Sequence, residues 1–348
     1  MTGKSHIELR TSPHVKAAHT VEQIMRNVVY ALLPIAAFAV WQFGVSALAL
    51  ILVVTASCLA TEYAFSRSAG RGNTLSDWSA AITGLLLALT LPPGFPLWMG
   101  AVAGFIAIAL GKTLFGGLGY NVFNPALVGR AFVQAAFPVA ITTWTPAGMP
   151  GRFMEFIPST LALPFMTPAP VSEWSRQAVD SFSGATPLAQ WKFEGVITST
   201  SDLFTGMTAG STGETSALLI LLCGAYLAAR RMMDWRIPAA VLLGAVVTAG
   251  LLYLVNDQHY PTPLFVLFSG GLMLGAMFMA SDMVASPVTP WGIWIYGLLI
   301  GVLTVVIRYF GGLSEGVMYA ILLGNALSPL IENLTQPRIY GARKGAKP

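Results

Sequence analysis

Charged residues are scarce in this sequence. Only 10% of its 348 residues are Asp, Glu, Lys or Arg, whereas 55% are hydrophobic. A soluble globular domain carries roughly 25% charged residues, so this composition excludes an ordinary soluble protein. The apolar runs reach transmembrane length without the alternation of barrel strands, which indicates helices that cross a lipid bilayer.

Cysteine and histidine are also rare. The two cysteines, Cys58 and Cys223, both fall within apolar runs, so nothing supports a disulfide framework, a zinc site or a cysteine-ligated iron–sulfur cluster. Three of the four histidines precede the first apolar run and His259 lies at the edge of a later one, which argues against a haem held by two histidines. We therefore expect no resident metal.

Two further absences narrow the class of protein. No Gly-x-Gly-x-x-Gly follows a strand, so we expect no dinucleotide-binding domain. The first 23 residues are polar and lack an apolar core, so we expect no cleavable signal peptide. The net charge of +4 resides mainly in short loops and tails. It predicts membrane orientation rather than nucleic-acid binding.

Apolar windows of about 20 residues follow one another along the chain. The ten windows span residues 25–42, 44–64, 78–93, 96–114, 123–141, 214–232, 236–255, 262–281, 290–309 and 316–334. The third is short and ends at Leu91-Pro92-Pro93, and the fifth begins at Asn124-Pro125, a favourable helix start. The predicted fold class is an all-α polytopic membrane protein with about ten transmembrane helices.

The two halves share a glycine pattern. Gly116-Gly117 precedes Gly129-Arg130-Ala131, and Gly311-Gly312 precedes Gly324-Asn325-Ala326 at the same spacing. Because each half holds an odd number of windows, we predict two inverted five-helix repeats; chance spacing of glycine is the competing interpretation. The predicted segments are an N-terminal segment (1–24), the first repeat (25–141), a long external loop (142–213), the second repeat (214–334) and a C-terminal tail (335–348).

Lysine and arginine are distributed unevenly between the two sides of the predicted bundle. If the N-terminus is cytoplasmic, fourteen of them lie inside and four lie outside, namely Arg152, Arg176, Lys192 and Arg308. The positive-inside rule then predicts that both termini are cytoplasmic. The 142–213 loop would face the periplasm of a bacterial inner membrane.

The 142–213 loop contains the run Asp180-Ser181-Phe182-Ser183-Gly184-Ala185-Thr186. It resembles the acceptor sequence of flavin transferases, which join FMN to a threonine hydroxyl through a phosphoester. On this basis Thr186 carries the flavin on an exposed loop, while Ser183, Gly184 and Ala185 surround it and Asp180 belongs to the transferase's recognition signal. The competing interpretation is an unmodified, solvated loop threonine.

Several other runs occur in the order of a single family. They are Ser12-Pro13-His14, the 119–127 stretch GYNVFNPAL and Gly129-Arg130-Ala131-Phe132. With the flavin-acceptor run, they resemble the family of the RnfD membrane subunit of the Rnf electron-transport complex and its relative NqrB, a membrane subunit of the sodium-pumping NADH:quinone reductase. The resemblance covers nearly the whole chain.

This resemblance implies two flavins. Thr186 matches the threonine that bears covalent FMN, and Asn121 and Asn124 match asparagines beside a non-covalently held riboflavin. An amide group offers both a donor and an acceptor, which suits the mixed edge of a flavin ring. The competing interpretation is that Asn124 is only a helix N-cap and Asn121 a turn residue.

Three of the charged residues within or at the ends of the apolar windows, Arg130, Glu62 and Asp282, are candidates for a functional role. Arg130 falls inside the fifth window, where an ionised side chain needs a partner or water. We expect it to offset negative charge on a reduced flavin near Asn121 and Asn124, with snorkelling to the interface as the alternative. Glu62 and Asp282 could guide a cation, but the simpler expectation for both is a solvated helix end.

The predicted function is a flavin-carrying subunit of an ion-translocating ferredoxin:NAD oxidoreductase complex, with electron relay coupled to Na⁺ or H⁺ transport. The resemblance implies partners: other subunits of the complex, including a second FMN-carrying subunit and iron–sulfur subunits, and a flavin transferase during maturation. We expect no complete active site, and hence no catalytic residue, in this chain. The rival prediction is a solute channel or transporter with the same inverted-repeat fold and no redox role.

Overall fold

The computed structural model describes residues 20–70, 72, 74–164, 166, 185–214 and 216–337. Across these residues the chain is helical and contains no strand, which confirms the all-α prediction. The first-half elements are α1 (Val21–Phe43), α2 (Val45–Ser68), η1 (Leu75–Asp77), α3 (Ser79–Thr90), α4 (Leu97–Ala109), η2 (Thr113–Phe115), α5 (Pro125–Ala136) and α6 (Pro138–Ile141).

Short elements join the two halves. These are α8 (Pro187–Ala189), a π-helical turn η3 (Gln190–Glu194) and α9 (Thr200–Thr205). The second half contains α10 (Ala217–Ala229), α11 (Arg236–Val255), α12 (Pro263–Phe268), α13 (Leu272–Leu274), a second π-helical turn η4 (Gly275–Met279), α14 (Pro290–Phe310) and α15 (Val317–Thr335).

Six helical segments are long and apolar enough to cross a membrane. They are Val21–Phe43, Val45–Ser68, Leu97–Phe115, Arg236–Val255, Pro290–Phe310 and Val317–Thr335. The other predicted windows hold shorter or interrupted helices: α3, α5 with α6, α10, and α12 with α13 and η4. Each predicted window therefore contains helix, and the protein is a polytopic membrane protein. The ten-span inverted repeat stays a prediction.

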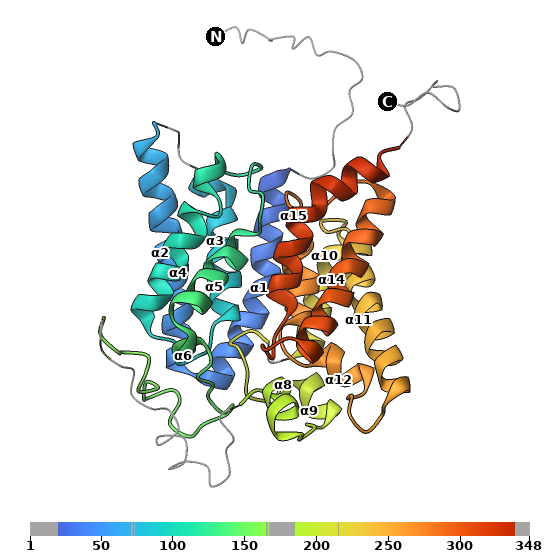
Figure 1. Cartoon of the computed structure of the whole chain (residues 1–348). Coiled ribbons are helices and arrows are strands. Elements are labelled where there is room, and N and C mark those ends of the chain that lie inside the picture. Colours follow the sequence, from blue (N-terminus) through green and yellow to red (C-terminus); the bar gives the residue numbers. More distant parts are fainter. Residues whose placement is uncertain are drawn as a thin grey trace, which may run out of the picture.

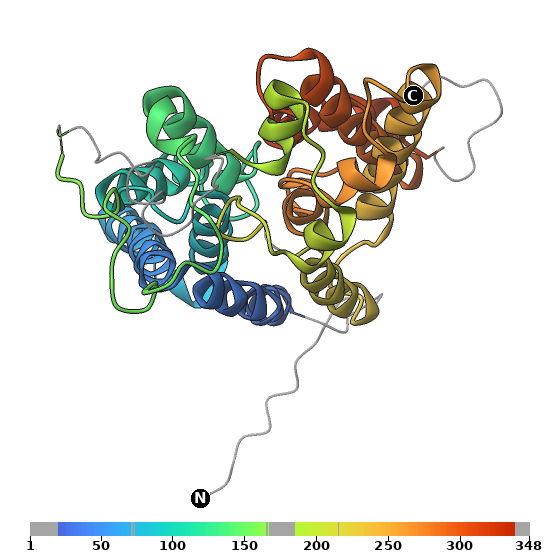
Figure 2. The ribbon, with the colours of Figure 1, turned by 90° about the horizontal axis from the view of Figure 1, so that it is seen from below.

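The helices form two groups. Figure 2 shows α1–α6 on one side and α10–α15 on the other, with α1 and α10 where the groups adjoin. In Figure 1, α1 begins and α15 ends at one end of the bundle, and α8 and α9 cover the opposite end. We call these the α1-start end and the α8 end.

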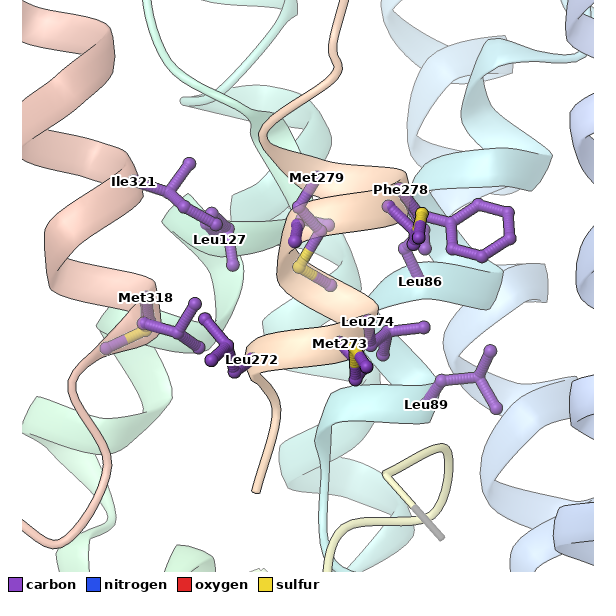
Figure 3. Packing of buried hydrophobic residues seen from close by; sticks show 14 of the residues in the cluster. Leu86, Leu89, Leu127, Leu272, Met273, Leu274, Phe278, Met279, Met318 and Ile321 are labelled. Carbon is purple, nitrogen blue, oxygen red and sulfur yellow. The ribbon is translucent and has the colours of Figure 1, made fainter. Parts of the chain in front are cut away.

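A broken helix from the second half runs through the middle of the molecule. In Figure 3, α13 and η4 lie between α3, with Leu86 and Leu89, and α15, with Met318 and Ile321. The break before α13 occurs at Gly270, whose φ of +62° favours glycine. Leu272, Leu274 and Met279 are almost fully buried, so apolar side chains fill the interface between the halves.

Glycines permit the closest contact between helices. A Cβ on Gly244 of α11 would lie 2.7 Å from the backbone oxygen of Leu298 in α14. The predicted repeat has a matching pair of contacts, because Gly129 of α5 packs on α4 and Gly324 of α15 packs on α14. The glycine pairs preceding them differ, however, since Gly116 has φ +117° and Gly311 has φ −77°.

Gly244→Ala should destabilise the protein. A backbone oxygen cannot yield as a side chain can, so we expect a loss of about 1–3 kcal/mol in the free energy of unfolding, measured in mixed detergent micelles. Gly250→Ala, in the same helix, is the matched control. Its Cβ would meet only Pro263 Cγ at 3.8 Å, so the better helix propensity of alanine should leave stability equal or higher. Equal losses in both variants would contradict this account.

Candidate functional sites

A pocket lies between the two groups of helices at the α1-start end. It contains about 810 Å³ of empty space, a volume that includes open solvent. Its wall is largely apolar and includes Met25, Val28, Leu86, Leu227, Met277 and Phe278. Its polar lining includes Ser79, Lys112, Asn121, Asn124, Ser281 and Asp282.

Asn124 belongs to the pocket as a structural residue. Its Oδ1 accepts hydrogen bonds from the backbone amides of Ala126 (3.0 Å) and Leu127 (3.4 Å), which confirms the predicted N-cap of α5. Its Nδ2 donates to the carbonyl oxygen of Met279 at 3.3 Å. Both polar atoms of the amide are thus engaged, and Asn124 joins the start of α5 to η4.

Asn121 and Asp282 form the polar corner of the pocket. Asn121 is buried, and its Nδ2 donates to the carbonyl oxygen of Phe123 at 3.2 Å and lies 3.5 Å from Asp282 Oδ2. Burial raises the pKa of the Asp282 carboxyl, whereas bonds from the Val284 amide and Asn121 act in the opposite direction. Asp282 is therefore part of the pocket wall, which corrects the expectation of a solvated helix end.

Lys112 separates this pocket from a second, more polar one. Its ammonium donates to both carboxylate oxygens of Glu62, at 2.6 and 2.8 Å, and also to the hydroxyl of Ser79. Glu62 is only 5% exposed, so the expectation of a solvated helix end was wrong for this residue too. Lys112 lines both pockets, with Glu62 and Asp77 on the side of the second.

Arg130 does not line the pocket beside Asn121 and Asn124. Its guanidinium donates to Glu214 Oε1 at 3.4 Å and Glu315 Oε2 at 3.0 Å. Both carboxylates belong to the second half and stand at the α8-end starts of α10 and α15. The arginine therefore has protein partners rather than the predicted flavin, and it neither snorkels nor stands alone.

Thr186 lies at the α8 end and is covered. It is 2% exposed, and its Oγ accepts a hydrogen bond from the Ala189 amide at 3.3 Å as the N-cap of α8. Pro187 in the first turn favours this helix start. The prediction that Thr186 lies on an exposed loop is therefore wrong, because its side chain is buried. Ala185 is half-buried, whereas Asp180, Ser183 and Gly184 lie outside the described residues.

The segment after Thr186 is anchored to the second half. Lys192 Nζ donates to the carbonyl oxygens of Arg308 and Leu313, each at 2.8 Å, and also to that of Gly311. The rings of Trp191 and Tyr309 lie 5.1 Å apart. Sequence reasoning placed Lys192 in the loop but missed this role, because its acceptors are backbone carbonyls that no residue pattern reveals.

Comparison with known proteins matches the sequence of this chain to one family. The model of the NQR2, RnfD, RnfE family matches residues 8–341. The chain is 41% identical over 343 residues to the D subunit of the Na(+)-translocating ferredoxin:NAD(+) oxidoreductase complex of Acetobacterium woodii, covering 97% of this chain and 96% of the relative.

Two further relatives are similar over nearly their full length. The D subunit of the proton-translocating ferredoxin:NAD(+) oxidoreductase complex of Clostridium ljungdahlii is 38% identical, with 98% of each chain covered. The D subunit of the ion-translocating oxidoreductase complex of Alcanivorax borkumensis is 39% identical, with 95% of this chain and 96% of the relative covered. The chain thus belongs to the NQR2, RnfD, RnfE family of membrane proteins.

Proposed function

We propose that the chain is the flavin-carrying membrane subunit of an ion-translocating ferredoxin:NAD oxidoreductase complex. The observation that carries the proposal is the position of two candidate flavin sites at opposite ends of one bundle. Thr186 is the N-cap of α8, whereas the pocket with Asn121 is lined by Ile24 and Met25 from the start of α1. A hydrocarbon core of about 30 Å would separate them, so a centre in another subunit would connect them.

The first site would hold FMN as a phosphoester on Thr186. When bound there, the flavin would supply electron transfer. Ala185 and Thr186 lead directly into α8, and in the turn that follows, the Trp191 ring packs against the ring of Tyr309. These rings offer apolar surface for an isoalloxazine group. The Thr186 hydroxyl is buried in the structure. A transferase could therefore reach it only if α8 moved away from the rest of the helix bundle.

The second site would hold riboflavin without a covalent bond. The methionine-rich wall of the pocket fits a flat, largely apolar ring, while the Asn121 amide and Asp282 carboxyl fit its polar edge. Asn124 would act through the backbone by holding the start of α5 against η4. Arg130 would have no contact with this flavin, because its guanidinium is bound to Glu214 and Glu315.

The remaining parts of the proposal concern the complex. The chain would lie in a bacterial inner membrane with both termini cytoplasmic and the Thr186 segment periplasmic. Its partners would be iron–sulfur subunits, a second FMN-carrying subunit and, during maturation, a flavin transferase. Electron transfer would be coupled to movement of Na⁺ or H⁺, the two ions named for the relatives from Acetobacterium woodii and Clostridium ljungdahlii.

Mass spectrometry of the native chain tests the central part of this proposal. The chain should be produced with its transferase, and its peptides mapped. We expect the peptide containing Thr186 to carry the added mass of one FMN less one water. An unmodified chain that conducts solute in liposomes would instead support a channel.

The second flavin can be tested separately through Asn121. Asn121→Ala should lower the flavin released on denaturation roughly tenfold at limiting flavin, the effect of one lost hydrogen bond of about 1.4 kcal/mol. Covalent flavin should not change. Asn333→Ala, on the exposed surface of α15, is the control. Equal release from the native chain and the Asn121 variant would contradict a flavin at this corner.

A further inference from the structure

A buried cluster of charged side chains lies at the α8 end, away from the pocket. Arg130 binds Glu214 and Glu315, whose side chains are 2% and 14% exposed. Arg308, which is fully buried, completes the cluster. These residues come from α5, the segment before α10, the turn before α15 and the last turn of α14.

The two carboxyl groups lie close to each other. A Cβ on Gly270 would be 3.2 Å from Glu315 Oε1, and one on the adjacent Gly271 would be 2.4 Å from Glu214 Oε1. Both carboxylates therefore pack against Gly270 and Gly271, where the absence of side chains leaves space for them. Each also gives one oxygen to the same guanidinium, that of Arg130.

Among the described residues, each carboxyl group retains one oxygen without a hydrogen bond. Arg130 engages Glu214 Oε1 and Glu315 Oε2, whereas Glu214 Oε2 and Glu315 Oε1 are buried and have no partner in this part of the chain. A buried acceptor in this condition costs free energy unless something satisfies it. The hydroxyl of Ser211, also buried, lies beside Glu214 and supplies no charge.

The second arginine of the cluster donates its hydrogen bonds to backbone carbonyl oxygens and not to the carboxylates. Arg308 donates Nη1 to the carbonyl oxygen of Val266 at 2.7 Å and Nη2 to that of Ser269 at 3.0 Å, so it is bound to the last carbonyls of α12. Lys192 is likewise bound to carbonyl oxygens. Within the described residues of this cluster, Arg130 alone bonds the carboxylates, and the charge of Arg308 acts on both of them without a hydrogen bond.

We propose that Glu214 and Glu315 form a buried acid pair that holds one exchangeable proton at neutral pH. The proton reduces the repulsion between the two neighbouring carboxylates and gives one unbonded oxygen a donor to offer. The electrostatics agree with this geometry: burial first, and then the charge of Glu315, raise the pKa of Glu214 to about 8, against the opposing charge of Arg130. The pair does not depend on either proposed flavin.

Infrared spectroscopy of the full chain in detergent tests the proposal. At neutral pH, glutamate-specific ¹³C labelling should shift a carbonyl band of a protonated carboxylic acid. The band should be absent from Glu214→Gln and from Glu315→Gln, and it should persist in Glu155→Gln, which alters an exposed glutamate. The band should disappear as the pH rises, with a midpoint of about 8.

Three results would overturn the proposal. The native labelled chain could lack a glutamate carboxylic acid band at neutral pH, a result that needs no folded variant. The band could survive in both Gln variants. Finally, Na⁺ added at constant pH could abolish it, which would make the pair a sodium site instead of a proton site.

Stability provides a second readout. Between the ordinary glutamate pKa of 4.5 and about 8, the folded chain holds a proton that the unfolded chain has released. The free energy of unfolding should therefore fall as the pH rises through this window. Glu214→Gln should remove this part of the slope and Glu155→Gln should retain it; an unchanged slope in Glu214→Gln would count against the pair.

Discussion

Thr186→Ala should abolish the proposed covalent attachment of flavin completely. No other hydroxyl stands at the end of the acceptor-like run from Asp180 to Thr186, and a methyl group cannot form a phosphoester. Co-expression with the transferase, followed by denaturing electrophoresis, measures the effect directly. We expect the flavin fluorescence of the protein band to fall to background.

Two matched variants separate this loss from misfolding. Thr186→Ser keeps the hydroxyl that caps α8, and Thr198→Ala removes a hydroxyl from the same segment away from the acceptor-like run. Thr198→Ala should fluoresce as the native chain does, and Thr186→Ser should fold as the native chain does. Fluorescence that persists in Thr186→Ala would place the flavin elsewhere and remove the basis of the proposed FMN site at Thr186.

Arg130→Met should strongly destabilise the contact between the two halves of the molecule. It would leave Glu214 and Glu315 buried without their shared partner. Removing one member of a buried ion pair costs about 3–5 kcal/mol. Equilibrium unfolding in mixed micelles should show a loss of this size, whereas Arg230→Met at the exposed end of α10 should change stability by less than about 0.5 kcal/mol.

A compensating variant makes the cause specific. Combining Arg130→Met with Glu214→Gln and Glu315→Gln removes the uncompensated charge and should recover most of the lost stability. Arg308 remains bound to the carbonyl oxygens of Val266 and Ser269 in this variant. If the triple variant is as unstable as Arg130→Met, the loss arises from packing of the arginine and not from its charge.

The positions of the helices could be predicted from local sequence. Each apolar window holds helix in the structure, since burial of apolar side chains in a bilayer depends on composition over about 20 neighbouring residues. The cap of α5 was equally predictable, because Asn124 and Pro125 act on amides within the same turn. The break at Gly270 was not predicted, since it depends on α14, whose Arg308 binds the carbonyl oxygens around it.

The partners of the charged residues could not be predicted in this way. Arg130 bonds Glu214 and Glu315, which are 84 and 185 residues away, and Glu62 bonds Lys112 across 50 residues. Glu62, for which solvent or a cation was expected, therefore has a protein partner instead. Only the packing of distant segments against one another decides which charges meet.

Composition and local runs by themselves determined the membrane class, the helical segments and the candidate positions Asn121, Asn124 and Thr186. Those features depend on residues within about 20 positions of each other. The tertiary structure alone decided that Thr186 is covered, that Asp282 shares the pocket with Asn121, and that Arg130 serves an acid pair at the other end. Burial and charge pairing arise between segments far apart in the chain, and no local pattern specifies such contacts.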